Sequence, residues 1–346
     1  MFRTADGQSP DTAPPKSRQR PWPKRTPGRA SGTGHGGLVT RPDHPMLGVG
    51  LMIGFCITAP LLDVAAKLAS AQISVGQITA ARFVIQAAIM LPVCLVLRQS
   101  LRPERQDIGL ISLRALLLLA ATFFFVSAIR VMPLADALAI VFVEPFLILL
   151  MGKFFLGETI GARRIGAAIV GFAGVLMVIQ PSFEAFGTVA LLPLGTAVTF
   201  ASYMLVTRKL SARMDPVAMQ YQTAVFGGAM AVVILAASYP SNAPSLQVTM
   251  PQGIYWLWLF GVGAFASLSH MLITMALRFA PSATLAPLHY TELISAGIFG
   301  YLVFGDFPNT LALTGIAVIL LAGLYVIHRE RITARAQVTA QPPEPI

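Results

Sequence analysis

The sequence predicts an all-α integral membrane protein with ten transmembrane helices in two inverted five-helix repeats, and three observations lead to this fold class. Hydrophobic residues make up 55% of the 346 residues and charged residues only 12%, with a mean hydropathy of +0.70. Soluble proteins carry about 25% charged residues. Ten apolar stretches of about 17 to 25 residues recur, each long enough to cross about 30 Å of hydrocarbon as a helix. The third observation is an internal repeat.

Joints rich in proline and glycine separate the ten stretches, and no joint is long enough to form a second folded domain. The stretches lack the alternating pattern of about ten residues that is typical of an outer-membrane barrel, so a helical bundle is predicted. Their approximate ranges are 46–68, 75–97, 110–128, 133–155, 165–180, 187–207, 216–238, 254–277, 281–304 and 309–327.

Residues 1–45 differ in kind from the rest of the chain. They carry eight Lys or Arg and many Pro, Gly and Ser residues, so they cannot bury enough apolar surface to order themselves. No cleavable apolar segment precedes Met46, which argues against a secretory signal peptide. A tether to lipid or nucleic acid is the alternative. We interpret the segment as a disordered basic cytoplasmic tail.

The distribution of Lys and Arg predicts the orientation in the membrane. With a cytoplasmic N-terminus, the inner loops and the two tails hold 21 of the 25 positive residues, as the positive-inside rule requires. Both termini are therefore predicted to be cytoplasmic, with residues 329–346 as a C-terminal tail. The net charge of +10 is explained by topology, so no nucleic-acid partner is expected.

The internal repeat divides the chain into a first five-helix unit, 46–180, and a second, 187–328. A shift of 148 places lays residues 128–158 over 276–306 without a gap, and a shift of 142 places sets Lys67-Leu68 over Lys209-Leu210. Identical residues at the longer shift are Ala128 and Ala276, Arg130 and Arg278, Pro133 and Pro281, Glu144 and Glu292, Gly152 and Gly300, and Gly157 and Gly305.

Because each repeat has an odd number of helices, the second must enter the membrane from the opposite side. Inverted repeats of this kind are typical of many secondary transporters, whose substrate sites lie near the bilayer midplane between the halves. A duplicated half can also be a relic without mechanical meaning, as in some channels and membrane enzymes. Transport is the interpretation that we favour.

The segment from Pro133 through Glu144-Pro145 to Gly157-Glu158, and then Gly166 and Gly174, resembles the drug/metabolite transporter superfamily, EamA type. The resemblance covers residues 46–328. It implies a ten-helix carrier that moves small metabolites, amino acids, vitamins or drugs by alternating access, often as an exporter. The second repeat departs from the pattern, with Asp306 in place of Glu and Leu293 in place of the proline.

Glu144 and Glu292 are the first candidate site residues. Both lie near mid-depth, where a charge costs about 2.5 to 3.5 kcal/mol, so a lipid-facing position is disfavoured. Facing a shared cavity, they would bind a cation, a cationic substrate group or a coupling proton. The alternative is a static ion pair or hydrogen bond that fixes helix packing. Pro145 cannot donate to the carbonyl of Val141, so it is predicted to open the helix as a gating position.

Arg82 and Asp63 are further candidates for substrate or proton binding. Arg82 would hold a substrate carboxylate or phosphate, or would neutralise Glu144. Asp63 and Lys67 lie four residues apart with the acid first, a pair worth a few tenths of a kcal/mol in water. Mutual neutralisation of these two residues near the outer end of the first helix is the favoured interpretation for Asp63, with a half-way substrate position as the alternative.

His270, His289 and Tyr203 complete the candidate set. His289 shares a helix face with Glu292, and His270 shares one with Ser267, which would suit a proton relay. The alternative for both histidines is a hydrogen-bonded packing role. For Tyr203 on the sixth stretch, bonding to neighbouring helices is favoured over substrate binding.

No catalytic signature occurs in the sequence, and neither a cofactor nor a metal site is expected. The leading prediction is a secondary active transporter in the bacterial cytoplasmic (inner) membrane, with a small-molecule substrate and the lipid bilayer as partners. An exporter, coupled to protons or to a counter-solute, is favoured, and a homodimer is compatible with the sequence. Alternatives are a riboflavin-like vitamin importer and a membrane-embedded enzyme acting on lipid-linked substrates.

Overall fold

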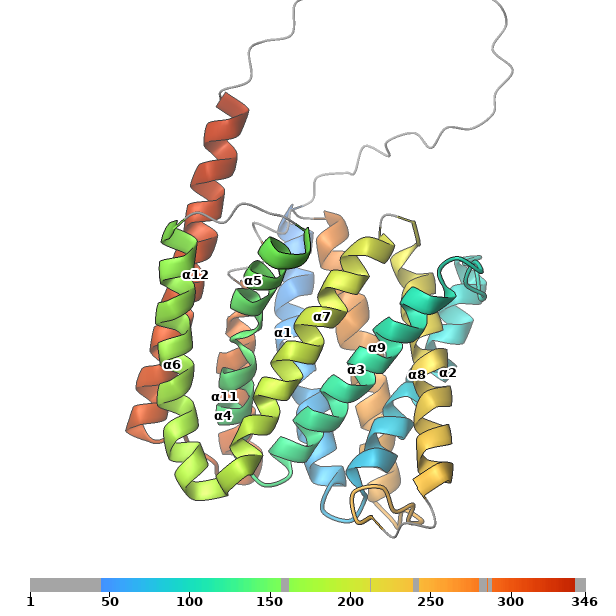
Figure 1. Cartoon of the computed structure of the whole chain (residues 1–346). Coiled ribbons are helices and arrows are strands. Elements are labelled where there is room, and N and C mark those ends of the chain that lie inside the picture. The colour runs from blue at the N-terminus through green and yellow to red at the C-terminus, as the bar shows by residue number, and fades with distance from the viewer. Residues whose placement is uncertain are drawn as a thin grey trace, which may run out of the picture. The chain divides into compact units, whose positions relative to one another are not determined.

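The computed structural model describes residues 45–156, 162–211, 213–238, 243–279, 285 and 288–339. These residues form helices and no strand, which confirms the all-α class (Figure 1). The helices are α1 Pro45–Ala69, α2 Val75–Val96, α3 Ile108–Ile129, α4 Leu134–Val141, α5 Glu144–Leu156, α6 Ala162–Phe186, the 3₁₀ turn η1 Gly187–Leu191, α7 Leu192–Ser211, α8 Pro216–Ser238, α9 Tyr255–Phe279, α11 Thr291–Phe304 and α12 Thr310–Thr339.

Six helical stretches in the described part of the chain are long and apolar enough to cross a membrane, judged by length and composition. One of them, residues 165–207, spans 43 residues and joins α6, η1 and α7. Helix α11 and residues 310–325 of α12 are apolar but shorter. The chain is therefore a multi-span helical membrane protein.

The observed helices differ from the predicted stretches at three places. The fourth stretch is divided into α4 and α5. Helix α6 continues past the predicted end at 180 to Phe186, with Pro181 inside it. Helix α12 continues into the predicted tail and ends at Thr339. Residues 1–44, the Gly157-Glu158 motif and Pro281 lie outside the described residues.

Local sequence signals explain where several helices begin. The side chain of Ser74 accepts a hydrogen bond from the Gln77 amide at the start of α2, and Asn309 accepts one from the Ala312 amide at the start of α12. Such side-chain caps satisfy amides that have no partner within the helix. Helix α8 begins at Pro216, where the missing N–H removes no helical bond.

The helices of the unit formed by residues 41–346 pack in a small number of pairs. Helix α1 contacts α9 and α11, whereas α7 contacts α3, α4 and α5. Helix α2 contacts α8 and α9, and α3 contacts α8. Helices α6 and α12 pack against each other side by side (Figure 1).

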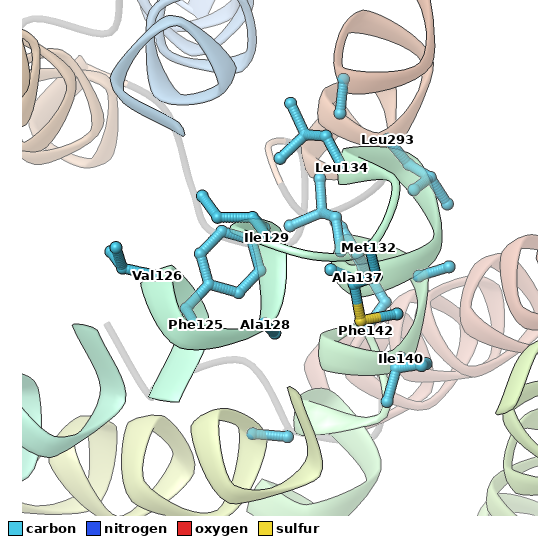
Figure 2. Close-up of a cluster of buried hydrophobic side chains, with 14 of the residues drawn as sticks. Phe125, Val126, Ala128, Ile129, Met132, Leu134, Ala137, Ile140, Phe142 and Leu293 are labelled. Atoms are coloured by element: carbon cyan, nitrogen blue, oxygen red, sulfur yellow. The ribbon is translucent and has the colours of Figure 1, made fainter. Parts of the chain in front are cut away.

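A cluster of apolar side chains surrounds the connection between α3 and α4. Phe125 and Ile129 at the end of α3, Met132 in the connection, Leu134 in α4 and Leu293 in α11 are all at most 9% exposed (Figure 2). Close packing of this kind stabilises helix contacts in a membrane, where lipid is as apolar as the side chains. The cluster packs α4 against α11 and so places the α4–α5 break beside α11.

Helices α6 and α12 approach closely at two glycines. A Cβ atom on Gly315 would lie 2.6 Å from the carbonyl oxygen of Gly174, and one on Gly174 would lie 2.9 Å from that of Gly315. Only residues without a side chain allow such an approach of two backbones. Gly174, which belongs to the superfamily pattern, therefore has a packing reason.

We predict that Gly315→Ala lowers the stability of the α6–α12 contact by about 1 to 3 kcal/mol, because the added methyl group forces the two backbones apart. The measurement is the thermal unfolding midpoint of the purified protein in detergent. Gly166→Ala on α6 is the control, since its added Cβ meets nothing within 4 Å. Equal midpoints for the two variants would contradict this account of the helix contact.

Candidate functional site

Two helices of the bundle begin beside Glu144 and Glu292, the two acids that align when the sequence is shifted by 148 places. Helix α4 ends at Val141 and α5 begins at Glu144, while α11 begins at Thr291 with Glu292 in its first turn. Pro145 stands at the second position of α5, two residues after the break between α4 and α5, and its predicted gating role stays a prediction. Helix α11 begins at the equivalent place without a proline. Both acids therefore lie at helix N-termini, where the helix dipole favours negative charge.

His289 joins the two acids in one cluster. Its Nε2 atom lies 2.9 Å from Oε2 of Glu292, which confirms that these two side chains share a face. Glu144 lies within electrostatic range of both His289 and Glu292. The structure thus brings together a carboxylate from each repeat and one imidazole, which we call the acid–histidine cluster.

The acid–histidine cluster is flanked by aromatic rings but is not sealed. The rings of Phe55 on α1 and Phe142 after α4 face the His289 ring edge-on, with centroids 5.4 and 5.7 Å away. The side chain of His289 nevertheless remains 37% exposed, and that of Glu292 10% exposed. Ionisable side chains in a membrane bundle that keep this access typically face the bundle interior or a water-filled cavity.

Arg82 lies on α2 and its guanidinium bonds only uncharged groups in the described residues. It donates to the Thr122 hydroxyl, and Nη2 lies 3.2 Å from Nε2 of His270. The acid within its electrostatic range is Asp63, so the predicted alternative of pairing with Glu144 receives no support. Asp63 also lies within range of Glu292. Asp63 therefore lies within electrostatic range of both Arg82 and the acid–histidine cluster.

Arg114 on α3 is a buried charge that the sequence analysis missed. Its Nη2 donates to the Tyr203 hydroxyl at 2.6 Å, and its Nε donates to the Thr207 hydroxyl at 2.8 Å. The guanidinium also donates to Thr223 and lies 4.5 Å from the centroid of the Tyr203 ring. The favoured helix-bonding role of Tyr203 fits these contacts. An arginine inside the third apolar stretch was the signal that could have revealed this group.

The predicted pairing of Asp63 with Lys67 is wrong. Lys67 Nζ instead lies 2.8 Å from Oδ2 of Asp306, donates to the Met132 carbonyl at 3.0 Å, and stands 4.5 Å from the centroid of the Phe304 ring. A contact between neighbours on one helix contributes only a few tenths of a kcal/mol. Three partners offered by other parts of the fold outweigh it. The contact ties the first repeat to the end of α11.

The fold and these contacts define a multi-span helical membrane protein whose bundle holds charged and hydrogen-bonded side chains. The profile of the EamA-like transporter family matches residues 46–180 and again residues 187–328. The chain belongs to this family, and so to the drug/metabolite transporter superfamily.

Related proteins carry transporter names at about one-quarter identity. A riboflavin transporter of Brucella anthropi is 26% identical over 82% of this chain and 99% of its own length. An S-adenosylmethionine uptake transporter of Rickettsia bellii is 24% identical over 82% of this chain and 94% of its own length. A pseudopaline exporter of Pseudomonas aeruginosa is 24% identical over 80% of this chain and 94% of its own length.

A solved crystal structure of a protein shares the fold. It has a TM-score of 0.55 and 18% sequence identity, and the match covers 78% of this chain and 93% of that chain.

We predict that Tyr203→Phe destabilises the protein by about 1 to 3 kcal/mol, because it leaves a buried donor of Arg114 without its acceptor. Thermal unfolding in detergent measures the loss. Tyr301→Phe, which changes a side chain on α11 that is 58% exposed, is the matched control and should leave the midpoint unchanged. A Tyr203 variant as stable as the control would overturn this role.

The Lys67–Asp306 contact is tested by a double-mutant cycle. Lys67→Met combined with Asp306→Asn should show a coupling energy of about 0.5 to 3 kcal/mol, because each single change removes the same ion pair. Thermal or denaturant unfolding supplies the free energies. The comparison cycle is Lys67→Met with Asp63→Asn, for which we expect a smaller coupling. A larger coupling to Asp63 would restore the pairing along the helix.

Proposed function

We propose that this chain is a secondary active transporter that carries a small metabolite, amino acid, vitamin or drug across the cytoplasmic membrane by alternating access. Membership of a transporter family and relatives with transporter names support the class. One observation carries the mechanism. A carboxylate from each repeat, Glu144 and Glu292, lies at the start of a half-helix beside a partly accessible histidine. Broken helices of this kind hold the substrate and ion sites of many carriers.

The proposed architecture is ten transmembrane helices in two inverted repeats, 46–180 and 187–328. Exchanging the repeats replaces α1 by α7, α2 by α8, α3 by α9, α4 and α5 by α11, and α6 by α12. Under this exchange the α1–α9 contact becomes α7–α3, α2–α9 becomes α8–α3, and α1–α11 becomes the contact of α7 with α4 and α5. Each of these pairs is a helix contact of the structure, which supports the two-fold relation.

The proposal also covers the orientation of the chain, the membrane in which it lies and the source of energy for transport. The distribution of Lys and Arg supports cytoplasmic termini and an inner-membrane location. The start of α1 and the end of α12 lie at the same end of the unit formed by residues 41–346 (Figure 1). Protons or a counter-solute are the proposed source of energy, with His289 and the two glutamates as the groups that would exchange a proton.

Export is the proposed direction, and uptake of a riboflavin-like vitamin is the second candidate. The relatives named above include two uptake or vitamin proteins and one exporter, so both directions deserve measurement. Export and uptake can be distinguished with proteoliposomes that contain the purified chain. A labelled metabolite mixture is placed either inside or outside the vesicles, and its movement across the membrane is measured. A solute that leaves chemically altered would favour the membrane-embedded enzyme instead.

We predict that Glu144→Gln cripples transport while the amount of protein in the membrane stays normal, because the variant keeps the shape of the side chain but removes its charge. Glu292→Gln should reduce transport less or shift its pH dependence, since this acid already has His289 as a partner. Initial transport rates between about pH 5 and about pH 8 measure both effects.

Glu184→Gln, a change at an exposed acid near the end of α6, is the matched control for loss of one carboxylate. Normal rates for both cluster variants across the pH range would exclude a carboxylate role in transport.

A further inference from the structure

Two arginines lie deep in the bundle on neighbouring helices, away from the acid–histidine cluster. Arg82 on α2 is 7% exposed and Arg114 on α3 is 3% exposed. His270 and Tyr203 each lie within electrostatic range of both guanidinium groups. The two positive charges therefore belong to one region, bounded by α2, α3, α7, α8 and α9.

Among the described residues, the hydrogen bonds of these two guanidinium groups end on neutral acceptors. The hydroxyl of Thr122 donates its own hydrogen to the Leu118 carbonyl, and that of Thr207 donates to the Tyr203 carbonyl, so each offers only a lone pair to its arginine. A guanidinium has no acceptor atom, so His270 meets Arg82 through an unprotonated, uncharged nitrogen. None of these partners contributes negative charge.

Asp63 supplies negative charge to this region but shares it with other groups. It acts on Arg82 and at the same time lies within range of Glu292. Two buried cations facing one carboxylate leave an excess of one positive charge. Buried charge without a partner costs several kcal/mol, so the region is suited to a further anion.

The two arginines differ in how many of their guanidinium nitrogens have a hydrogen-bond acceptor. Arg114 donates through Nε, Nη1 and Nη2 to side chains and a carbonyl of α7 and α8. Arg82 Nε is buried and has no acceptor among the described residues. Gln86, one turn further along the same face of α2, likewise has a buried Oε1 without a donor in the described part of the chain. An unused donor and an unused acceptor thus lie one helical turn apart on α2.

We propose that Arg82 binds an anionic group, a carboxylate or a phosphate, of the transported solute. The flat guanidinium edge that includes the free Nε matches two oxygens of such a group. Gln86 Oε1 accepts a bond from an amino or hydroxyl group of the same solute. Arg114 is a positioning residue that supplies the second positive charge. The proposal rests on the transporter function and narrows its substrate to acids that carry a neighbouring hydrogen-bond donor.

The first measurement is binding to the full chain in detergent, and it does not depend on transport. Sodium lactate and L-alanine should raise the thermal unfolding midpoint, and neutral lactamide should not. Inorganic phosphate in parallel distinguishes a phosphate site from a carboxylate site. Arg82→Gln should abolish the rise, whereas Arg102→Gln at an exposed arginine should preserve it. Equal responses to lactate and lactamide, with no response to phosphate, would overturn the proposal.

The second measurement is uptake of a labelled metabolite mixture into proteoliposomes. Every accumulated solute should carry a carboxylate or phosphate, and Arg82→Gln should raise KM on the order of 10- to 100-fold. Arg82→Lys should raise KM less, because lysine keeps the positive charge but cannot bind two oxygens at once as the planar guanidinium does. Asp63→Asn should lower KM, because it removes the negative charge that competes with the solute.

The outcomes separate this proposal from the proposed function. Transport of neutral solutes with no response to anions would refute the anion site and leave the transporter intact. An anion response that depends on Arg82, without movement of any solute, would refute the transporter and leave the site. If Arg82→Gln does not fold, the anion site is tested by Arg82→Lys and by comparing lactate with lactamide on the unaltered chain.

Discussion

The cost of charge in an apolar bundle governs the arrangement of this protein. A charge at the centre of a bilayer costs about 2.5 to 3.5 kcal/mol even on insertion scales, so each ionisable side chain there needs a partner or access to water. The structure meets this demand in two ways. His289 pairs with Glu292 and stays partly accessible, whereas Arg114 is enclosed by hydroxyls and an aromatic ring. The first arrangement leaves the groups free to exchange partners, and the second fixes them.

The breaks between helices also reflect the need of polar groups in an apolar bundle for a partner or for water. Irregular backbone at membrane depth needs partners from protein or water. The break between α4 and α5 lies beside a tightly packed apolar cluster that includes Met132 and Leu293, and α11 begins at the equivalent position. Leu293 stands in α11 where the 148-residue shift places Pro145 in α5, so packing and the charge at the helix start support the beginning of α11. Each acid gains a favourable interaction with its helix dipole.

Much of the fold could be predicted from the sequence. Hydropathy is a property of residues that are neighbours along the chain, and the internal repeat is visible when the sequence is aligned with itself. The all-α class and the family followed from such signals. Long-range partners could not be read in this way. Lys67 was assigned to Asp63 four residues earlier, but Asp306 lies next to it in space. The exception is His289, whose partner Glu292 lies only three residues further along the chain, and this contact was predicted.

Arg114 shows why the candidate site was only half visible in the sequence. It has no equivalent charge in the second repeat, so the repeat gave it no emphasis, and its partners Tyr203 and Thr207 lie on another helix. Its importance is a property of tertiary packing. The acids, by contrast, stand at matching positions of both repeats and were visible from the alignment of the chain with itself.

Asp63 gives the two charged regions a physical means of communication. It lies within electrostatic range of both Arg82 and Glu292, so a charge bound at either group would act on it. In the proposed carrier, an anion at Arg82 weakens the attraction that holds Asp63. The balance between Asp63 and the acid–histidine cluster then changes, although the solute touches neither Glu292 nor His289. Coupling between solute and proton would thus need no long chain of contacts, only one carboxylate within range of both sites.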